Sequence, residues 1–257
     1  MHRGRGHNRT AMKQRTPAIC LRTSDYSETS QVVLFFTREA GAVRMLAKGA
    51  KRSKSTTGGA IDLLAEGELV FIAPREGSLG TLTEFAESSV HLGLRRCAVC
   101  LNAALYMVEL VGALMGEGDP HPEAFDLLHN ALSRLDQPDA PALAVLAYFQ
   151  WRLLRHAGLL GRFEQCVACG AKISGEWEAY FSSQLGGLLC PQCEVSEGEK
   201  YRLAEGELAA LKALSAAAAG RRVHLPDKQA RAVNRLLAYH VQNQLGRAMK
   251  MARHAIG

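Results

Sequence analysis

The stretch Gln31–Lys48, QVVLFFTREAGAVRMLAK, contains two apolar runs separated by a short polar segment. Each run, Gln31–Thr37 and Ala42–Lys48, has the length of a strand, and the first is rich in β-branched and aromatic side chains. The segment between them ends in Gly41, which is typical of a turn. The stretch therefore predicts a β-hairpin.

Runs of the same kind flank this hairpin on both sides. Four further strands are expected at Ala18–Arg22, Ile61–Leu64, Glu68–Ala73 and Leu79–Glu87. The segment Pro74–Gly77 supplies a turn between the last two. Five or six short strands within about 70 residues favour a small barrel over an open α/β sheet.

Beyond Val90 the apolar residues recur at helical spacing, and a first long helix is expected from Leu94 to Met115. Further helices are predicted at Pro122–Leu135, Ala142–His156, Ala204–Ala218 and Lys228–Gln244. Strands followed by helices indicate an α+β multidomain chain. We expect a disordered basic arm over residues 1–16, a barrel over 17–88, a helical domain over 89–162 and 195–257, and a metal-binding module over 163–194.

The net charge of +6 is unevenly distributed along the chain. Residues 1–60 contain 12 Lys and Arg against 3 Asp and Glu, residues 221–257 contain 8 against 1, and acidic residues predominate between them. Two basic ends favour binding to a polyanion. No apolar run approaches the roughly 18 residues of a membrane span, and the first residues lack the apolar core of a secretory signal. We therefore expect no membrane association and a cytoplasmic, nucleoid-associated protein, whose thiols stay reduced.

Two CxxC pairs, Cys166-Val-Ala-Cys169 and Cys190-Pro-Gln-Cys193, are separated by a 20-residue spacer. This spacing is typical of a four-cysteine zinc site, in which each pair places two thiolates on a tight turn. Four thiolates complete a tetrahedron and leave no position for a reactive water. We predict one structural zinc ion that stabilises a small module, with a redox dithiol or a coincidental spacing of thiols as the alternatives.

Two other cysteine or histidine patterns are given structural interpretations. His121-Pro-Glu123 partly matches the HxE…PCxxC signature of zinc deaminases, but neither Cys166 nor Cys190 follows a proline. His121 and Glu123 are instead expected at the start of a helix. A third CxxC, Cys97–Cys100, falls within the first predicted long helix, where Cys97 is expected to be a buried small hydrophobe.

The segment Lys48–Lys54, KGAKRSK, places four cations in seven residues directly after a predicted strand. Small residues between the cations allow the backbone to approach phosphates, although a solvated loop is the alternative. Candidate DNA contacts are Lys48, Lys51, Arg52 and Lys54, with Arg22, Arg38 and Arg44 as weaker candidates. No base-reading element is evident, so sequence-independent binding is expected. Arg247, Lys250 and Arg253 predict a second basic stripe on a terminal helix.

Common motifs of phosphate and hydrolytic chemistry are missing from the sequence: it contains no GxxxxGK[ST], GxGxxG or HExxH motif and no nucleophile elbow. We therefore expect no enzymatic activity. From the residues alone, the favoured interpretation is a zinc-containing protein that binds nucleic-acid backbones without reading bases. The main alternative is a zinc-ribbon transcription or RNA regulator, and a metal-dependent hydrolase or deaminase is a third class.

Several segments, taken in order, resemble RecO proteins. They are Ala18–Thr29, Phe36–Gly41, Ala47–Arg52, Gly58–Ala60, Leu82–Glu87, Phe149–Gly158, Cys166–Gly170, Tyr180–Ser182 and Gly186–Cys193. The resemblance spans residues 17–255 and is far more specific than any single motif. The chain departs from the family in its basic N-terminal arm.

The resemblance implies a fold and a function in DNA repair and recombination. It implies an N-terminal OB-fold barrel and a helical domain with an inserted zinc-binding module. It further implies binding to single- and double-stranded DNA and annealing of complementary strands. The implied partners are RecR and the C-terminal tail of single-stranded-DNA-binding protein (SSB), so that RecA is loaded at gaps. Members of the family differ in whether the zinc cysteines are present, so the metal is expected to be architectural.

Overall fold

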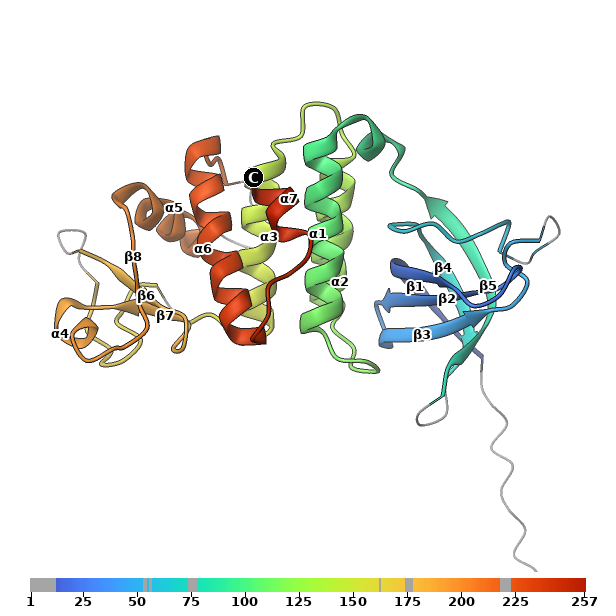
Figure 1. The fold of residues 1–257 in the computed structure, drawn as a ribbon, viewed down its shortest axis with the longest axis horizontal. Coiled ribbons are helices and arrows are strands. Elements are labelled where there is room, and N and C mark those ends of the chain that lie inside the picture. The colour runs from blue at the N-terminus through green and yellow to red at the C-terminus, as the bar shows by residue number, and fades with distance from the viewer. Residues whose placement is uncertain are drawn as a thin grey trace, which may run out of the picture. The chain divides into compact units, whose positions relative to one another are not determined.

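The structure is a computed structural model that describes residues 13–52, 55, 57–73, 78–161, 163–173, 178–217 and 223–257 (Figure 1). The chain forms two compact units. The first comprises the residues up to Val90 together with Gly116–Pro122, and the second comprises His91–Met115 and Glu123–Gly257. No described helix is both long enough and apolar enough to cross a membrane.

The first unit is a closed five-stranded barrel. Its strands are β1 (Lys13–Asp25), β2 (Gln31–Thr37), β3 (Gly41–Ala47), β4 (Glu66–Ile72) and β5 (Gly80–Ser89). They follow the order β1-β2-β3-β5-β4 around the barrel and close through the β1–β4 pair. The β3–β5 pair is parallel and the others are antiparallel. The predicted OB-type barrel is therefore confirmed.

The barrel core is built from the alternate residues of each strand. Val33, Phe35 and Met45 are fully buried inside it, and the rings of Phe35 and Phe85 lie 5.1 Å apart. The strands were predicted from apolar runs of strand length, and this period of two is the burial pattern that such strands adopt in the barrel. The intervening residues lie on the other side of each strand, where some of them, such as Arg22 and Arg44, are exposed.

Strand β1 is longer than predicted and curves around the barrel. Residues Lys13–Ile19 pair with β4 and residues Ala18–Asp25 pair with β2, with a bulge between Cys20 and Arg22. Because β1 starts at Lys13, the last four residues of the predicted disordered arm are part of the sheet. Thr16 is buried and hydrogen bonds with Glu39. The rest of the predicted arm, residues 1–12, lies outside the described residues.

The predicted strand Ile61–Leu64 is wrong. Leu64 has a φ of 70°, and the chain turns there onto the bulged part of β1. The Leu64 N–H donates to Cys20 O at 3.0 Å, and the Cys20 N–H donates to Ala65 O at 2.9 Å. Ile61 and Leu64 are buried, so the apolar run reflects burial of a loop and not strand pairing.

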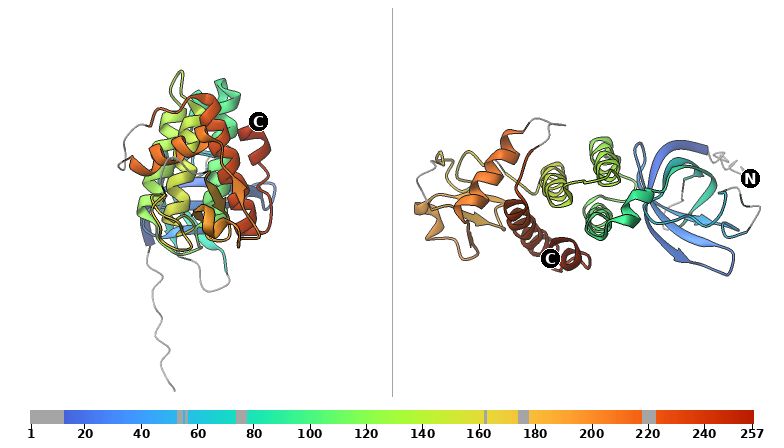
Figure 2. Two further views of the ribbon diagram at one scale, coloured as in Figure 1. Left: turned by 90° about the vertical axis from the view of Figure 1, so that its left-hand side faces the viewer. Right: turned by 90° about the horizontal axis from the view of Figure 1, so that it is seen from above.

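The second unit is mainly helical. Its elements are η1 (Leu92–Arg96), α1 (Ala98–Leu114), α2 (Pro122–Leu135), α3 (Ala142–His156), α5 (Glu205–Ala216), α6 (Asp227–Leu245) and α7 (Ala252–Ile256). Helix α3 packs against α1 and α6, and α6 also contacts α5 and α7. The right-hand view of Figure 2 shows α1, α2 and α3 nearly end-on. A buried amide pair joins α3 to α6, with Gln150 Nε2 donating to Asn234 Oδ1 at 2.8 Å.

Two helix predictions need correction. The first long helix is interrupted at Cys97, whose φ of −132° and ψ of 100° are extended and separate η1 from α1. The predicted basic stripe on the terminal helix is also wrong. Gly246 ends α6 with a φ of 66°, and α7 starts only at Ala252, so Arg247, Lys250 and Arg253 do not lie on one helix.

Candidate metal centre and nucleic-acid surface

The predicted cysteine module is a small part of the helical unit. It contains the sheet β7-β6-β8, formed by β7 (Gly187–Leu189), β6 (Tyr180–Ser182) and β8 (Tyr201–Arg202), and the short helix α4 (Pro191–Glu194). The first CxxC pair lies in a tight turn closed by the Gly170 N–H, which donates to Cys166 O at 2.8 Å. In the second pair, Cys190 precedes α4 and accepts from the Cys193 N–H at 3.1 Å. The Val167 N–H donates to Leu188 O at 2.8 Å, which holds the first turn against β7.

The four cysteines converge on one point. The sulfur atoms of Cys166, Cys169, Cys190 and Cys193 all lie within 4.8 Å of one another. The Sγ atoms of Cys169 and Cys190 are 3.7 Å apart. Zinc–sulfur bonds of about 2.3 Å give a tetrahedron with sulfur–sulfur edges of about 3.8 Å. The four cysteines are therefore positioned to hold a metal ion.

Cys166 and Cys193, one from each pair, have pKa values that are shifted in opposite directions. Burial raises the pKa of Cys166, but hydrogen bonds from the backbone N–H groups of Cys190, Cys169 and Ala168 outweigh it and bring this pKa to about 6. Hydrogen bonds with Cys169 and Cys190, together with partial desolvation, raise the pKa of Cys193 to about 12. A metal ion needs all four sulfurs as thiolates, so its binding releases the remaining protons.

Aromatic rings connect the cysteine module to the helices. Trp151 on α3 contacts Phe163 at 4.5 Å between ring centroids, and Phe163 stacks on Phe181 of β6 at 6.1 Å. Phe181 in turn meets His240 of α6 edge-on at 5.2 Å. These four side chains are fully buried. The module therefore shares a core with the helical unit instead of depending on the cysteines alone.

His121 and Glu123 do not join the cysteines. His121 Nε2 lies 3.1 Å from Asp119 Oδ2, and Glu123 Oε2 lies 3.2 Å from His156 Nδ1. Within the described part of the chain, the four-cysteine cluster is the one group of three or more potential ligands that converges. The deaminase interpretation therefore has no support from the geometry.

The outer face of the barrel carries two of the predicted cations in one row. Arg22 of β1 pairs in register with Leu34 of β2, which pairs with Arg44 of β3. Both arginines are exposed, and Leu34 is partly exposed between them. Residues directly opposite on neighbouring strands lie about 5 Å apart, so a single strand separates the two cations.

The predicted basic loop begins at the end of β3 and meets the β1–β2 turn. The Lys51 N–H donates to Thr29 O at 3.1 Å, and the Gly49 N–H donates to Ser30 Oγ at 3.2 Å. Lys48 and Arg52 are exposed, and neither makes an ion pair within the described residues. Lys54 lies outside the described residues.

Three of the predicted cations are already paired with acids. Lys51 Nζ lies 2.6 Å from Asp25 Oδ1, and Arg44 lies 2.7 Å from Glu117 Oε1. Arg38 lies 3.6 Å from its neighbour Glu39. Such exposed pairs are weak and are readily exchanged for a phosphate. Arg22, Lys48 and Arg52 are the better candidates because none of them is paired with a carboxylate of the described residues.

Tyr26 is a candidate that the sequence interpretation missed. It occupies the β1–β2 turn with 64% of its surface exposed, and its N–H donates to Ser30 O at 3.0 Å. It directly follows Asp25, the last residue of β1 and the partner of Lys51. An exposed ring beside cations is typical of surfaces that stack the bases of a single strand. A single aromatic residue in a polar turn has no periodicity that would reveal it.

The fold and the site define a class of protein: an OB-type barrel linked to a helical domain that carries four cysteines positioned to hold a metal ion. Comparison with known families supports this class over most of the chain. Residues 12–88 match the model of the Recombination protein O N terminal region, and residues 95–253 match that of its C terminal region. The chain belongs to the RecO family of DNA repair proteins.

Individual relatives agree with the family models. The DNA repair protein RecO of Myxococcus xanthus (strain DK1622) is 33% identical over 233 residues, which cover 91% of this chain and 93% of the relative. That of Anaeromyxobacter dehalogenans (strain 2CP-C) is 36% identical over 236 residues, which cover 88% of this chain and 91% of the relative. That of Alkaliphilus metalliredigens (strain QYMF) is 31% identical over 179 residues, which cover 70% of this chain and 71% of the relative.

Proposed function

We propose that this chain is a recombination mediator that binds single- and double-stranded DNA without sequence preference and anneals complementary strands. In this proposal it acts with RecR and with the C-terminal tail of SSB, so that RecA is loaded onto SSB-coated DNA. The proposed role is non-catalytic, and the chain performs it in the cytoplasm, on the nucleoid. Family membership supports this role.

The observation that carries the DNA-binding part is the cationic outer face of the barrel. Arg22 and the loop residues Lys48 and Arg52 offer positive charges that no acid neutralises within the described residues, and Tyr26 adds an exposed ring. Guanidinium and ammonium groups bind phosphate oxygens, which every sequence presents alike. Among its described residues, the barrel offers no helix that could enter a major groove, which favours backbone binding over base reading.

Annealing follows from the same electrostatics. Two DNA strands repel each other through their phosphates, and a cationic surface that neutralises part of this charge lets them approach. Stacking on an exposed ring holds bases without engaging their pairing edges. A strand bound in this way keeps its bases free to pair with a complement.

We propose zinc as the ion of the four-cysteine centre. Four thiolates with tetrahedral spacing suit zinc, and such a centre leaves no position for a substrate. When bound, the ion would hold the two cysteine turns together. Its role is architectural because the coordination sphere is already full.

A strand-annealing assay on SSB-coated DNA tests the proposal. Complementary strands would be coated with SSB and mixed with and without the purified chain, and duplex formation would be followed over time. The proposal expects faster annealing with the chain present. No acceleration at low salt would contradict the annealing role. A zinc-ribbon transcription or RNA regulator would instead show a strong preference for one duplex or RNA over mixed-sequence DNA.

A further inference from the structure

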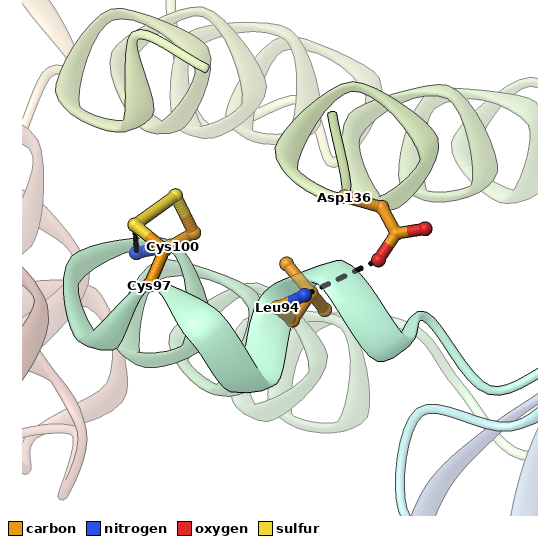
Figure 3. Close-up of a disulfide and its surroundings, with 4 residues drawn as sticks. All are labelled: Leu94, Cys97, Cys100 and Asp136. Carbon is orange, nitrogen blue, oxygen red and sulfur yellow. Dashed lines mark hydrogen bonds between the residues drawn. A yellow bond between two sulfur atoms is a disulfide. The ribbon is translucent and has the colours of Figure 1, made fainter. Parts of the chain in front are cut away.

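A second cysteine pair, outside the metal centre, lies at the start of α1. Cys97 and Cys100 are joined by a disulfide, and their Cα atoms are 5.2 Å apart, within the usual range of roughly 4.4–6.8 Å (Figure 3). This arrangement corrects the prediction that Cys97 is a buried apolar residue inside a continuous helix. Neither the proposed DNA binding nor the metal centre uses this pair.

The two sulfurs have different environments. Cys97 is the residue before the first turn of α1, is only partly buried, and has exposed neighbours on both sides, Arg96 and Ala98. Cys100 lies one turn further and is only 2% exposed. The backbone N–H of Cys100 donates to Cys97 Sγ at 3.2 Å. A thiolate at a helix N-terminus that accepts such a bond is stabilised, so Cys97 has the environment of an attacking thiol.

The backbone around Cys97 is held independently of the sulfur bond. The Leu94 N–H donates to Asp136 Oδ1 at 3.2 Å, as Figure 3 shows, and also to His91 O at 3.1 Å. Gly93 lies against Asp136 so closely that an added Cβ would be 2.1 Å from Asp136 O. The turn before Cys97 is therefore fixed on the end of α2. Opening the disulfide does not require this turn to move, so the dithiol keeps the geometry needed to close again.

Metal binding is a weaker explanation for the pair. Among the described residues no further His, Cys, Asp or Glu joins Cys97 and Cys100 to complete a group of three ligands. A CxxC pair at the first turn of a helix, with one accessible and one buried sulfur, is instead the arrangement of dithiols that undergo exchange. In reducing compartments such disulfides are transient rather than structural.

We infer that Cys97 and Cys100 form a reversible dithiol–disulfide pair that exchanges with small-molecule disulfides and dithiols. The Cys97 thiolate attacks one sulfur of the small disulfide, forms a mixed disulfide and releases one thiolate. The Cys100 thiolate then attacks Cys97 Sγ, forms the internal disulfide and releases the second thiolate. The protein loses two electrons and two protons, and the small disulfide is reduced to two thiols.

Trapping experiments on the full, metal-loaded chain test this assignment. The reduced protein would be incubated with oxidised glutathione, quenched with an alkylating reagent and analysed by peptide mass spectrometry. The wild-type chain is expected to form the Cys97–Cys100 disulfide and to recover both thiols in dithiothreitol. Cys100→Ser is expected to accumulate a stable mixed disulfide on Cys97. Cys97→Ser is expected to leave Cys100 unmodified because Cys100 is buried.

Internal controls separate this pair from the other cysteines. Cys20 is fully buried and burial raises its pKa to about 12, so it should stay unmodified throughout. Metal content measured before and after oxidation reports whether the four-cysteine centre is intact. Two results would overturn the inference: no internal disulfide in the wild type at any glutathione ratio, or modification of Cys100 in Cys97→Ser as fast as that of Cys97 in Cys100→Ser.

Discussion

Ser183 Oγ lies 2.8 Å from His240 Nδ1, and this contact joins the cysteine module to α6 in a fully buried position. The other ring nitrogen, His240 Nε2, lies 2.9 Å from Leu159 O. With a proton on Nε2 alone, the neutral ring donates to Leu159 and accepts from Ser183. A second proton, on Nδ1, would remove this acceptor.

This contact predicts that stability depends on pH. Burial lowers the pKa of His240 below its ordinary value of 6.5. The unfolded chain therefore takes up the proton first as the pH falls, so the contribution of His240 to the free energy of unfolding is complete above pH 6.5 and declines below it. Urea unfolding measured from pH 7.5 downward should show this loss, and His240→Gln should lose less than the wild type. An equal loss in both would contradict the role of His240.

The metal centre predicts one tightly bound ion per chain. Cys190→Ser removes a buried ligand and should abolish stoichiometric binding, because the remaining three thiolates leave the coordination sphere open. Metal content by atomic emission and the charge-transfer absorption of a cobalt-substituted protein would measure this. Cys20→Ser is the control, since Cys20 lies in the barrel and should leave the metal content unchanged. Full metal content in Cys190→Ser would refute the four-thiolate centre.

The exposed ring in the β1–β2 turn predicts a contribution to single-strand binding. Tyr26→Ala should weaken binding of a mixed-sequence single strand by about 1–3 kcal/mol, the usual value of one base–aromatic stack. Tyr26→Phe keeps the ring and should bind nearly as well as the wild type. Fluorescence anisotropy at constant salt would compare the three proteins. Equal affinity in Tyr26→Ala and Tyr26→Phe would show that the ring does not stack on bases.

The turn between β2 and β3 predicts a packing cost at one glycine. Gly41 has a φ of 68°, and an added Cβ would lie 2.2 Å from Asp119 O. Gly58 has a φ of 70° but nothing within 4 Å of an added Cβ. In both alanine variants the left-handed backbone lowers the free energy of unfolding by about 1–2 kcal/mol. Gly41→Ala must also displace the Gly116–Pro122 segment. Thermal unfolding should therefore rank Gly41→Ala as the less stable variant, and the opposite ranking would contradict the packing of Asp119.

The barrel strands and the four-cysteine cluster were predictable because their signals are local. The apolar runs of β2 and β3 have the length of strands and are separated by a turn that ends in Gly41, and each CxxC pair sets its own turn. The resemblance to RecO proteins supplied the OB topology, which no local pattern shows. The ion pair of Arg44 with Glu117 joins residues far apart in the sequence, so it could not be anticipated.

Other errors arose where the polarity of the side chains does not report the conformation of the backbone. Cys97 interrupts the helix although the surrounding apolar spacing is helical, because spacing does not report the extended conformation of one residue. Residues Lys13–Thr16 are largely polar, yet backbone pairing with β4 makes them part of a strand. Leu64 is apolar and buried but adopts a positive φ that ends the run.

The salt dependence of DNA binding tests the cationic barrel face most directly. Affinity for a mixed-sequence single strand would be measured over a range of salt concentrations for the wild type and two triple variants. The barrel variant is Arg22→Ala/Lys48→Ala/Arg52→Ala. The control variant is Arg96→Ala/Arg155→Ala/Lys228→Ala, which removes three exposed cations of the helical unit. Each lost phosphate contact reduces the slope of log affinity against log salt by about 0.7, so the barrel variant should show a slope shallower by about 2. The control should keep the wild-type slope. A barrel variant with the wild-type slope and affinity would contradict the account.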